Sequence, residues 1–475
     1  MADGNQLHGV EHIVVLMLEN RSFDHMLGYL YADSGNISPQ GHPFEGLRGK
    51  EGNPDAEGNP VTVFDITAST PNNYLMPGAD PGEGYVATSL QLFGSSTAPL
   101  PPVATNRGFI TNFATTLTGV DGHRTNVPGT VPSDIMGVYT PEMLPVLSAL
   151  ARGYAVCDHW FASAPTETFP NRAFANAATS QGRMDDAVSK FTCPSIFGRL
   201  GEAGLGWSIY GYDNAPLTRL NFPDTIDEAE SHFGVFSDFS AAAAGGMLTP
   251  YTFLEPSWGS SGNSQHPNYN VALGEQLIHD KYYALRNSPA WASTLLIVVY
   301  DEHGGCYDHV APPMGATPPD ASPGEFGFDF TRFGVRVPAV LVSPLIKAGT
   351  VFRPVGSTPL DHTSILKTIE TRWRLEPLSA RDAAAPDIGS VLTLSAPRRD
   401  DPLAHVVPPS FSGTNPAAGT PSHIQEVHAN LVSQLPVDPA DDPAPHGTAG
   451  LRSEQDYDNY IRIRTAAWVN KRSVT

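Results

Sequence analysis

The chain has 475 residues, of which 40% are hydrophobic and 16% are charged, a composition typical of a globular protein. Its formal net charge of −21 argues against a nucleic-acid-binding protein, because such proteins present a basic surface. The three cysteines, Cys157, Cys193 and Cys306, cannot all pair and form no CxxC motif. Neither a disulfide framework nor a zinc ribbon is therefore indicated.

The N-terminal segment has no charged region followed by an apolar stretch, so it does not resemble a secretory signal, although a signal could have been removed. No apolar run approaches the length of about 18 residues that a membrane-spanning helix needs. The sequence leaves a secreted or periplasmic mature form and a cytoplasmic protein as alternatives. It does not indicate an oligomeric state.

Short apolar runs rich in β-branched residues predict the strands. They cover residues 12–18, 294–300 and 337–343, with a weaker candidate at 206–212. None alternates polar and apolar residues, which is typical of strands buried on both faces of a parallel sheet. Helical patterns follow several of them, at residues 22–30, 144–156 and 361–375. This alternation predicts an α/β fold with a mostly parallel central sheet and helices on both faces.

The segments between and after these elements predict the domain organisation. Residues 36–133 are rich in Gly, Pro, Asn and Thr, and we interpret them as a long excursion that caps the sheet. Residues 395–422 are typical of an extended connector, and helical patterns follow at 422–435 and 453–472. We expect a main domain over residues 1–394, with the connector and terminal helices of residues 395–475 packed on its core.

Two of the predicted buried strands end in polar side chains, Glu19-Asn20 and Asp301-Glu302. In open α/β sheets ligands bind beyond the carboxyl ends of the strands, so parallel neighbours would bring these four side chains together. Their oxygen atoms suit one or more divalent cations, with Mg²⁺, Ca²⁺ or Mn²⁺ favoured and zinc as an alternative. The competing interpretation is that each pair caps the following helix. The repetition of the pattern after two buried runs favours the metal site.

Thr168 lies just before a predicted helix, because Pro170 suits a first helical turn. Backbone N–H groups at such a position favour anions and would hold a phosphate. A threonine hydroxyl becomes a nucleophile only when it is activated, and a metal ion can activate it. The alternative is an ordinary capping threonine.

Histidines near these segments are candidates for protonating a leaving oxygen. His266 lies in a polar loop and His303 follows the second acidic pair directly, although most of the 16 histidines must be structural. Arg21, Arg172 and Arg336 are expected to be internal salt-bridge partners rather than phosphate clamps.

Five motifs occur in an order that resembles the phosphoesterase family of the alkaline-phosphatase-like superfamily. They are "ENRSFDH" (19–25), "TFPNR" (168–172), "YDEHGGCYDHV" (300–310), "RVPAVLVSP" (336–344) and "DHTSILKTIE" (361–370). This family contains the bacterial and plant non-specific phospholipases C and a bacterial acid phosphatase, acid phosphatase A. The resemblance spans about residues 10–375.

The resemblance implies an alkaline-phosphatase-like fold, a phosphoesterase catalytic domain over residues 1–394, and roles for individual residues. The implied metal ligands are Glu19, Asn20, Asp301 and Glu302. Thr168 matches the nucleophile, and the implied phosphate site includes Thr168, Asn171, Gln265 and His266. His303 lies in a shared motif, and we include it among the catalytic candidates.

Two positions depart from the family pattern. The family often has "DPGH" before a "QLFG" segment, whereas this chain has "DPGEGYVATSLQLFG", so Glu83 replaces an expected histidine. The two polar positions before Pro267, sometimes both histidine, are here Gln265 and His266. Glu83 could protonate the leaving group if burial raised its pKa, or it could favour a second cation or a different substrate.

The expected function is a metal-dependent phosphoric ester hydrolase of the phospholipase C type. It would convert a phospholipid into diacylglycerol and a phosphorylated head group through a phospho-threonine intermediate. The alternatives are an acid phosphatase acting on small phosphomonoesters and a non-catalytic phosphate-binding protein. Expected partners are a phosphate ester or phospholipid, with transient membrane contact. The acidic composition disfavours anionic bilayers and leaves zwitterionic lipids open.

Overall fold

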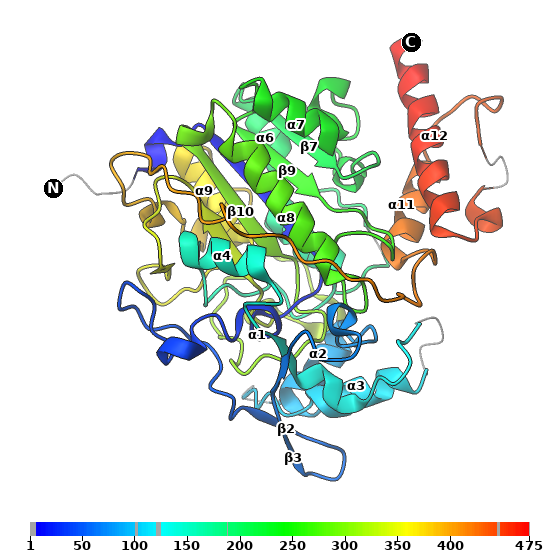
Figure 1. Ribbon diagram of the computed structural model, residues 1–475. Coiled ribbons are helices and arrows are strands. Elements are labelled where there is room, and N and C mark those ends of the chain that lie inside the picture. Colours follow the sequence, from blue (N-terminus) through cyan, green and yellow to red (C-terminus); the bar gives the residue numbers. More distant parts are fainter. Residues whose placement is uncertain (1–5, 100–102, 120–124, 188, 444–446, 475) are drawn as a thin grey trace.

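The apolar runs of the sequence form the centre of an eight-stranded sheet in the computed structural model, which describes residues 6–99, 103–119, 125–187, 189–443 and 447–474. The strand order is β12-β6-β11-β10-β1-β9-β7-β8 (Figure 1). The strands are β1 (His12–Leu18), β6 (Ala155–Val156), β7 (Trp207–Gly211), β8 (Phe233–Val235), β9 (Tyr251–Glu255), β10 (Thr294–Tyr300), β11 (Ala339–Val342) and β12 (Thr350–Val351).

Most neighbouring strands are parallel, as the sequence predicts. β1 pairs in parallel with β10, from His12 opposite Thr294 to Leu18 opposite Tyr300, and also with β9. The carboxyl ends of β1 and β10 therefore meet at one edge of the sheet. The expectation that the third apolar run is also parallel is wrong, because β11 is antiparallel to both β10 and β6. A continuous apolar run reports burial on both faces but carries no information about strand direction.

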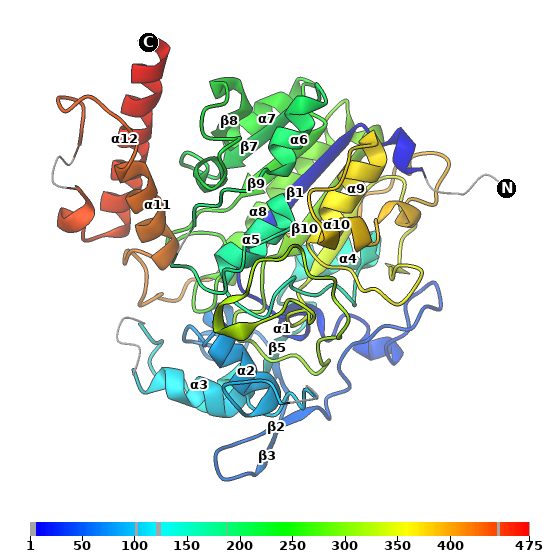
Figure 2. The same ribbon diagram turned by 180° about the vertical axis from the view of Figure 1, so that it is seen from behind.

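Helices cover both faces of the sheet, which confirms the predicted layers. One face carries α4 (Pro145–Gly153), α7 (Phe236–Ala244) and α8 (Val271–Arg286) (Figure 1). The other face carries α5 (Thr168–Ala177), α6 (Ile196–Glu202), α9 (Thr363–Trp373) and α10 (Ala380–Ala384) (Figure 2). The apolar core lies between these layers, and every residue of β10 is buried.

The described part of the 36–133 segment lies beyond the carboxyl end of β1, on the same side as α1 (Phe23–Leu27) (Figures 1 and 2). Its elements are β2 (Gly52–Pro54), β3 (Pro60–Thr62), β4 (Phe64–Ile66), α2 (Tyr85–Phe93) and α3 (Phe109–Leu117), and β4 pairs with β5 (Gly137–Tyr139). Phe109, Phe113 and Ile135 belong to an apolar cluster of this region. The segment therefore places structured chain directly over the strand ends.

The two predicted C-terminal helices are confirmed as α11 (His423–Ser433) and α12 (Glu454–Val474). They pack against each other and share an apolar cluster with Phe169 and Trp258 of the preceding chain. Among the described residues, no helix combines the length and the apolar character required to cross a lipid bilayer.

Candidate functional site

Asn20 joins four segments of the chain immediately after the end of β1. Its backbone is left-handed, with φ +57°, a conformation that asparagine tolerates better than most residues. Its main-chain N–H donates to Asp301 Oδ1 at 2.9 Å, and its side-chain Nδ2 donates to Glu83 Oε2 at 2.8 Å. Its Oδ1 accepts from the Thr168 hydroxyl at 3.3 Å. The structure thus brings Asn20, Asp301, Glu83 and Thr168 together from distant positions in the sequence.

Asp301 is held by protein donors on both carboxylate oxygens. Oδ1 also accepts from the Glu302 N–H at 2.8 Å, and Oδ2 accepts from Arg172 Nε at 2.9 Å. Arg172 Nη2 donates in addition to the Met17 and Leu18 carbonyls at 3.3 and 3.2 Å. The predicted internal salt bridge of Arg172 is therefore confirmed, and it fixes α5 to the ends of β1 and β10.

Glu19 and Glu302 each present a buried oxygen that has no hydrogen-bond partner, Oε1 in both cases. Burial raises the pKa of Glu19, and the neighbouring Asp301 raises it further. Burial also raises the pKa of Glu302 well above its ordinary value, with Glu83 and Asp301 as additional causes. Buried carboxylates without donors are costly, and a divalent cation with oxygen ligands would satisfy them. The residues present therefore fit the predicted metal.

Thr168 is the first residue of α5, and only 2% of it is exposed. The next N–H group of the helix, that of Phe169, donates to Asp186 Oδ1 at 2.7 Å, and Pro170 has no N–H. The helix terminus therefore already faces a carboxylate. Burial raises the pKa of Asp186 well above its ordinary value, followed by the charge of Glu167. Asp186 is not evident as a site residue from the sequence, because it lies in a loop 18 positions after Thr168 and no pattern links the two.

The amides of Asn171 and Gln265 are committed to the protein itself. Asn171 Oδ1 accepts from the Ala164 N–H at 3.0 Å, and its Nδ2 donates to three main-chain carbonyls of residues 164–167. Gln265 Oε1 accepts from the Tyr300 hydroxyl, and its Nε2 donates to the Val271 carbonyl at 2.9 Å. This geometry favours a role in shaping the turn before Thr168 and the loop before α8 over contact with phosphate.

His266 lies at the half-buried side of the site with two carboxylates. Its Nδ1 donates to the Pro267 carbonyl at 3.0 Å, and its Nε2 lies 3.8 Å from Asp80 Oδ1. One ligand atom from each of Asp80, Glu83 and His266 lies within 4.8 Å of the other two. His266 and Glu83 therefore lie in one group of side chains, and Glu83 is connected to Thr168 through Asn20.

His303 has a different environment. Its Nε2 lies 2.7 Å from Gln91 Oε1, and Gln91 is oriented because its Nε2 donates to the Gly82 carbonyl and to Asn112 Oδ1. His303 therefore donates from Nε2, and its Nδ1 lies 3.2 Å from Glu302 Oε2. Burial lowers the pKa of His303 to about 3. The one N–H of neutral His303 is therefore committed to Gln91, and its Nδ1 faces Glu302 Oε2 without a proton to donate.

The other two arginines differ from each other. Arg336 pairs with Asp24 at 2.8 Å and with Asp308 at 3.0 Å, so its predicted salt bridges are confirmed. The cluster of Asp24, Asp308 and His309 thus surrounds a guanidinium rather than offering a vacant cation site. Arg21, in contrast, donates to main-chain carbonyls and contacts His25, which departs from the expected ion pair.

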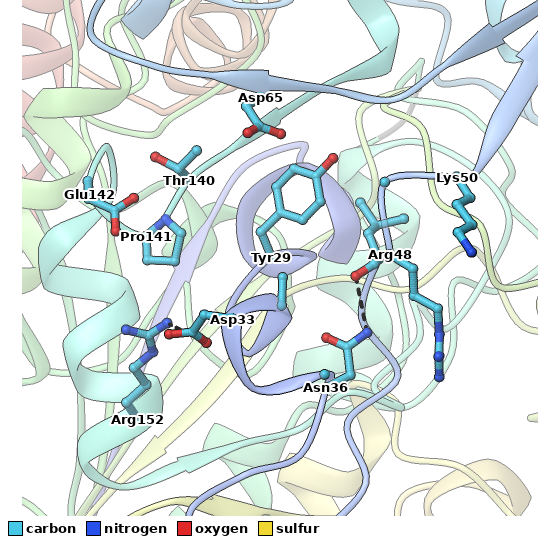
Figure 3. Close-up of a pocket in the computed structure, with 14 residues that line it drawn as sticks. Tyr29, Asp33, Asn36, Arg48, Lys50, Asp65, Thr140, Pro141, Glu142 and Arg152 are labelled. Carbon is cyan, nitrogen blue, oxygen red and sulfur yellow. Dashed lines mark hydrogen bonds and ion pairs between the residues drawn. The ribbon is translucent and has the colours of Figure 1, made fainter.

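An open cavity of about 560 Å³ lies elsewhere, beside α1 (Figure 3). Tyr29, Asp65, Arg48 and Lys50 are among its lining residues. None of the predicted site residues lines this cavity among those that the structure describes. The candidate site is instead a packed acidic cluster at the strand ends.

Solved structures match about half of the chain, with low TM-scores. One is a protein of the alkaline phosphatase superfamily from Vibrio parahaemolyticus, with a TM-score of 0.32 and 12% identity over 51% of this chain and 64% of that one. Another is the lipoteichoic acid synthase LtaP from Listeria monocytogenes, with a TM-score of 0.32 and 12% identity over 53% of this chain and 70% of that one.

Sequence relatives cover much more of the chain. Non-specific phospholipase C6 from Arabidopsis thaliana is 34% identical over 83% of this chain and 74% of the relative. Non-specific phospholipase C1 from the same plant is 35% identical over 83% of this chain and 73% of the relative. Phospholipase C A from Mycobacterium tuberculosis strain H37Rv is 28% identical over 82% of this chain and 78% of the relative. The phosphoesterase family pattern matches residues 10–376, and the chain belongs to the phosphoesterase family.

Proposed function

We propose that the chain is a metal-dependent phospholipase C that acts through a phospho-threonine intermediate. The relatives named phospholipase C support phosphoric ester hydrolysis as the reaction class. The observation that carries the proposal is the hydrogen bond from the Thr168 hydroxyl to Asn20 Oδ1. This bond holds the hydroxyl at the edge of the sheet where Glu19, Asp301 and Glu302 gather.

The residues that would hold the metal are Glu19, Asn20, Asp301 and Glu302. A divalent cation bound there would lower the pKa of the Thr168 hydroxyl and neutralise charge on the phosphate oxygens. The remaining chemistry belongs to the protein side chains. Asn20 orients the Thr168 oxygen, and Arg172 keeps Asp301 in place through the buried ion pair.

In the first step the Thr168 hydroxyl passes its proton to the group of His266 and Glu83, and its oxygen forms a bond to phosphorus as the bond between phosphorus and the glycerol oxygen breaks. The departing alkoxide takes a proton from His266 or Glu83, which lie together at the half-buried side of the site. Water then cleaves the phospho-threonine and restores the hydroxyl. The products from a phospholipid are diacylglycerol and the phosphorylated head group.

The charge of the site favours phosphodiesters over phosphomonoesters. In addition to the proposed metal ligands, Glu167 directly precedes Thr168, Glu83 is linked to it through Asn20, and Asp80 lies beside Glu83. A phosphodiester carries one negative charge, whereas a phosphomonoester carries up to two near neutral pH, so these carboxylates penalise the monoester more. This argument ranks the phospholipase C activity above an acid phosphatase.

The test is a pair of variants, Thr168→Ala and Thr168→Ser, assayed on phosphatidylcholine and on a chromogenic phosphomonoester with divalent metal present. We expect kcat of Thr168→Ala to fall about a thousandfold or more, because the other groups of the site contribute little to the rate once the nucleophile is removed. Thr168→Ser keeps a hydroxyl and retains measurable turnover to diacylglycerol. Wild-type turnover by Thr168→Ala with metal bound would contradict the covalent mechanism.

A further inference from the structure

We propose that a small apolar surface beside the site docks the protein on a zwitterionic phospholipid bilayer. This apolar rim is defined by the exposed side chains of Val86 and Phe326 and by Tyr85, which precedes Val86 in the chain and stacks on the Phe326 ring. The proposal rests on the proposed phospholipase C function and adds the surface through which the enzyme meets its substrate.

The rim adjoins the candidate site. Val86 is 42% exposed and Phe326 is 59% exposed. Tyr85 begins α2 only two positions after Glu83. Between them, Gly84 lies so close to Glu167 that a Cβ atom would meet its Oε1 at 2.5 Å. The rim therefore lies close in the chain to Glu83 and adjoins Glu167, the residue before Thr168.

The loop that carries Phe326 is held firmly in place. The Glu325 carboxylate accepts from Arg183 Nη1 at 2.9 Å and from the Met184 N–H at 2.8 Å. The Phe326 ring stacks on Tyr85, with ring centroids 5.5 Å apart and planes 10° from parallel. In Figure 2 this yellow-green loop lies beside α2. The exposure of the ring is thus a fixed feature of the surface.

The backbone of Phe326 supports the same conclusion. Its φ is +55°, a left-handed conformation that is a genuine outlier for a bulky residue. Strained residues of this kind persist where the surrounding contacts hold them, and they concentrate at functional positions. Here the strain turns an aromatic ring toward solvent instead of into the core.

A chain of aromatic contacts connects the rim to the nucleophile helix. The ring centroids of Tyr85 and Phe328 are 5.4 Å apart, those of Phe328 and Phe330 are 4.9 Å apart, and those of Phe330 and Phe174 are 5.9 Å apart. Phe174 belongs to α5, the helix that Thr168 begins. A bilayer seated on the rim would rest on the same packed unit that holds the reacting hydroxyl.

Charge at the rim selects the kind of bilayer. Two arginines of this region are engaged, Arg183 with Glu325 and the buried Arg332 over the Phe93 and Phe328 rings. Glu83 and Glu167 lie near the start of α2, and the chain carries a net charge of −21, so anionic lipids are repelled. The outermost group of phosphatidylcholine is a cation, which complements these carboxylates. The apolar side chains supply the remaining attraction.

The experiment compares vesicle binding by three full-length proteins in a Thr168→Ala background, which prevents lipid turnover. The rim variant combines Phe326→Asn and Val86→Ser, since asparagine accepts the left-handed backbone that the loop requires. The control is Met247→Asn, because Met247 is 70% exposed. It lies before the amino-terminal end of β9, whereas the candidate site lies at the carboxyl ends of β1 and β10. Flotation with phosphatidylcholine vesicles measures binding.

We expect the rim variant to bind about fivefold or more weakly than the parent, because interfacial binding scales with buried apolar area. The control binds like the parent. When Thr168 is retained, the rim variant should hydrolyse a water-soluble phosphocholine diester at a rate within about twofold of wild type, since its reacting groups are unchanged.

Undiminished vesicle binding by the rim variant would overturn the proposal, as would binding that requires anionic lipid. Sedimentation that reveals a dimer disrupted by the rim substitutions would assign the surface to a second copy of the chain instead. Failure of the proposed function is separate: wild-type protein would then leave the soluble diester intact, while the flotation result would stand on its own.

Discussion

The Arg172 guanidinium and the Asp301 carboxylate form a buried ion pair, with Nε 2.9 Å from Oδ2 and side chains only 6% and 0% exposed. Arg172 lies on α5, one turn after Thr168, and Asp301 follows β10. The pair therefore sets the distance between the proposed nucleophile and the acidic strand end.

Removal of Arg172 should be severely destabilising. In Arg172→Met the Asp301 carboxylate stays buried without its charge partner, which typically costs about 3–5 kcal/mol in the free energy of unfolding. Arg183→Met is the matched control, because its ion pair with Glu325 is 43% and 33% exposed. A pair of that kind contributes about 1 kcal/mol or less. Denaturant unfolding of both variants measures the difference, and equal losses would refute the structural role of Arg172.

Metal removal should destabilise wild type much more than Glu302→Gln. Without metal, the substitution removes one of several buried carboxylates that repel each other, so the melting temperature should rise above that of wild type. With Ca²⁺, Mg²⁺ or Mn²⁺ at about 1,000 times the dissociation constant, wild type should gain about 4 kcal/mol that Glu302→Gln largely lacks. Thermal unfolding with chelator and with each metal tests this. The same metal-dependent shift in both proteins would exclude Glu302 as a ligand.

The dependence of kcat on the leaving group should identify the proton donor. Glu83→Gln and His266→Gln are compared on a phosphocholine ester with an alkyl leaving group and on one with p-nitrophenol. Loss of the general acid should reduce kcat about 10²–10⁴-fold for the alkyl ester, because only that leaving group needs a proton. The p-nitrophenyl ester should be nearly unaffected. A variant that slows both esters equally has lost something other than the acid.

Glu275 should give the fold a pH dependence between about pH 4.5 and about pH 8. Its buried carboxylate accepts from the Val146 and Leu147 N–H groups, and burial raises its pKa to about 8. The folded state keeps this proton where the unfolded chain has lost it. The resulting stability is fully present below about pH 4.5 and disappears as the pH rises through about 8. Glu275→Gln should flatten this slope in denaturant unfolding, and an unchanged slope would assign it to other groups.

Sequence patterns predicted the central strands well because burial alone determines them. β1 and β10 have the predicted bounds, since each is a continuous apolar run. β9 and α8 were missed. β9 has only five residues, and its burial depends on lying between β1 and β7. α8 contains Gly274, which interrupts the helical pattern, yet a side chain there would collide with Gln265, so tertiary packing requires it.

The candidate site was predictable where chemistry follows a strand end, as at Glu19 and Asp301. It was not predictable where a long-range contact decides the role of a side chain. Asn171 and Gln265 resemble ligand-binding amides in the sequence, but the folded chain uses both amides for its own hydrogen bonds. Asp186 shows the reverse, because only the tertiary structure places it against the helix of Thr168.

Position 20 combines two independent requirements. The left-handed backbone admits glycine, asparagine and aspartate most readily, and the side chain must donate to Glu83 while accepting from Thr168. Of those three residues only asparagine carries both an amide donor and a carbonyl acceptor. A saturation library at position 20, selected for folding alone, would return glycine, asparagine and aspartate. Selection for turnover would return asparagine alone.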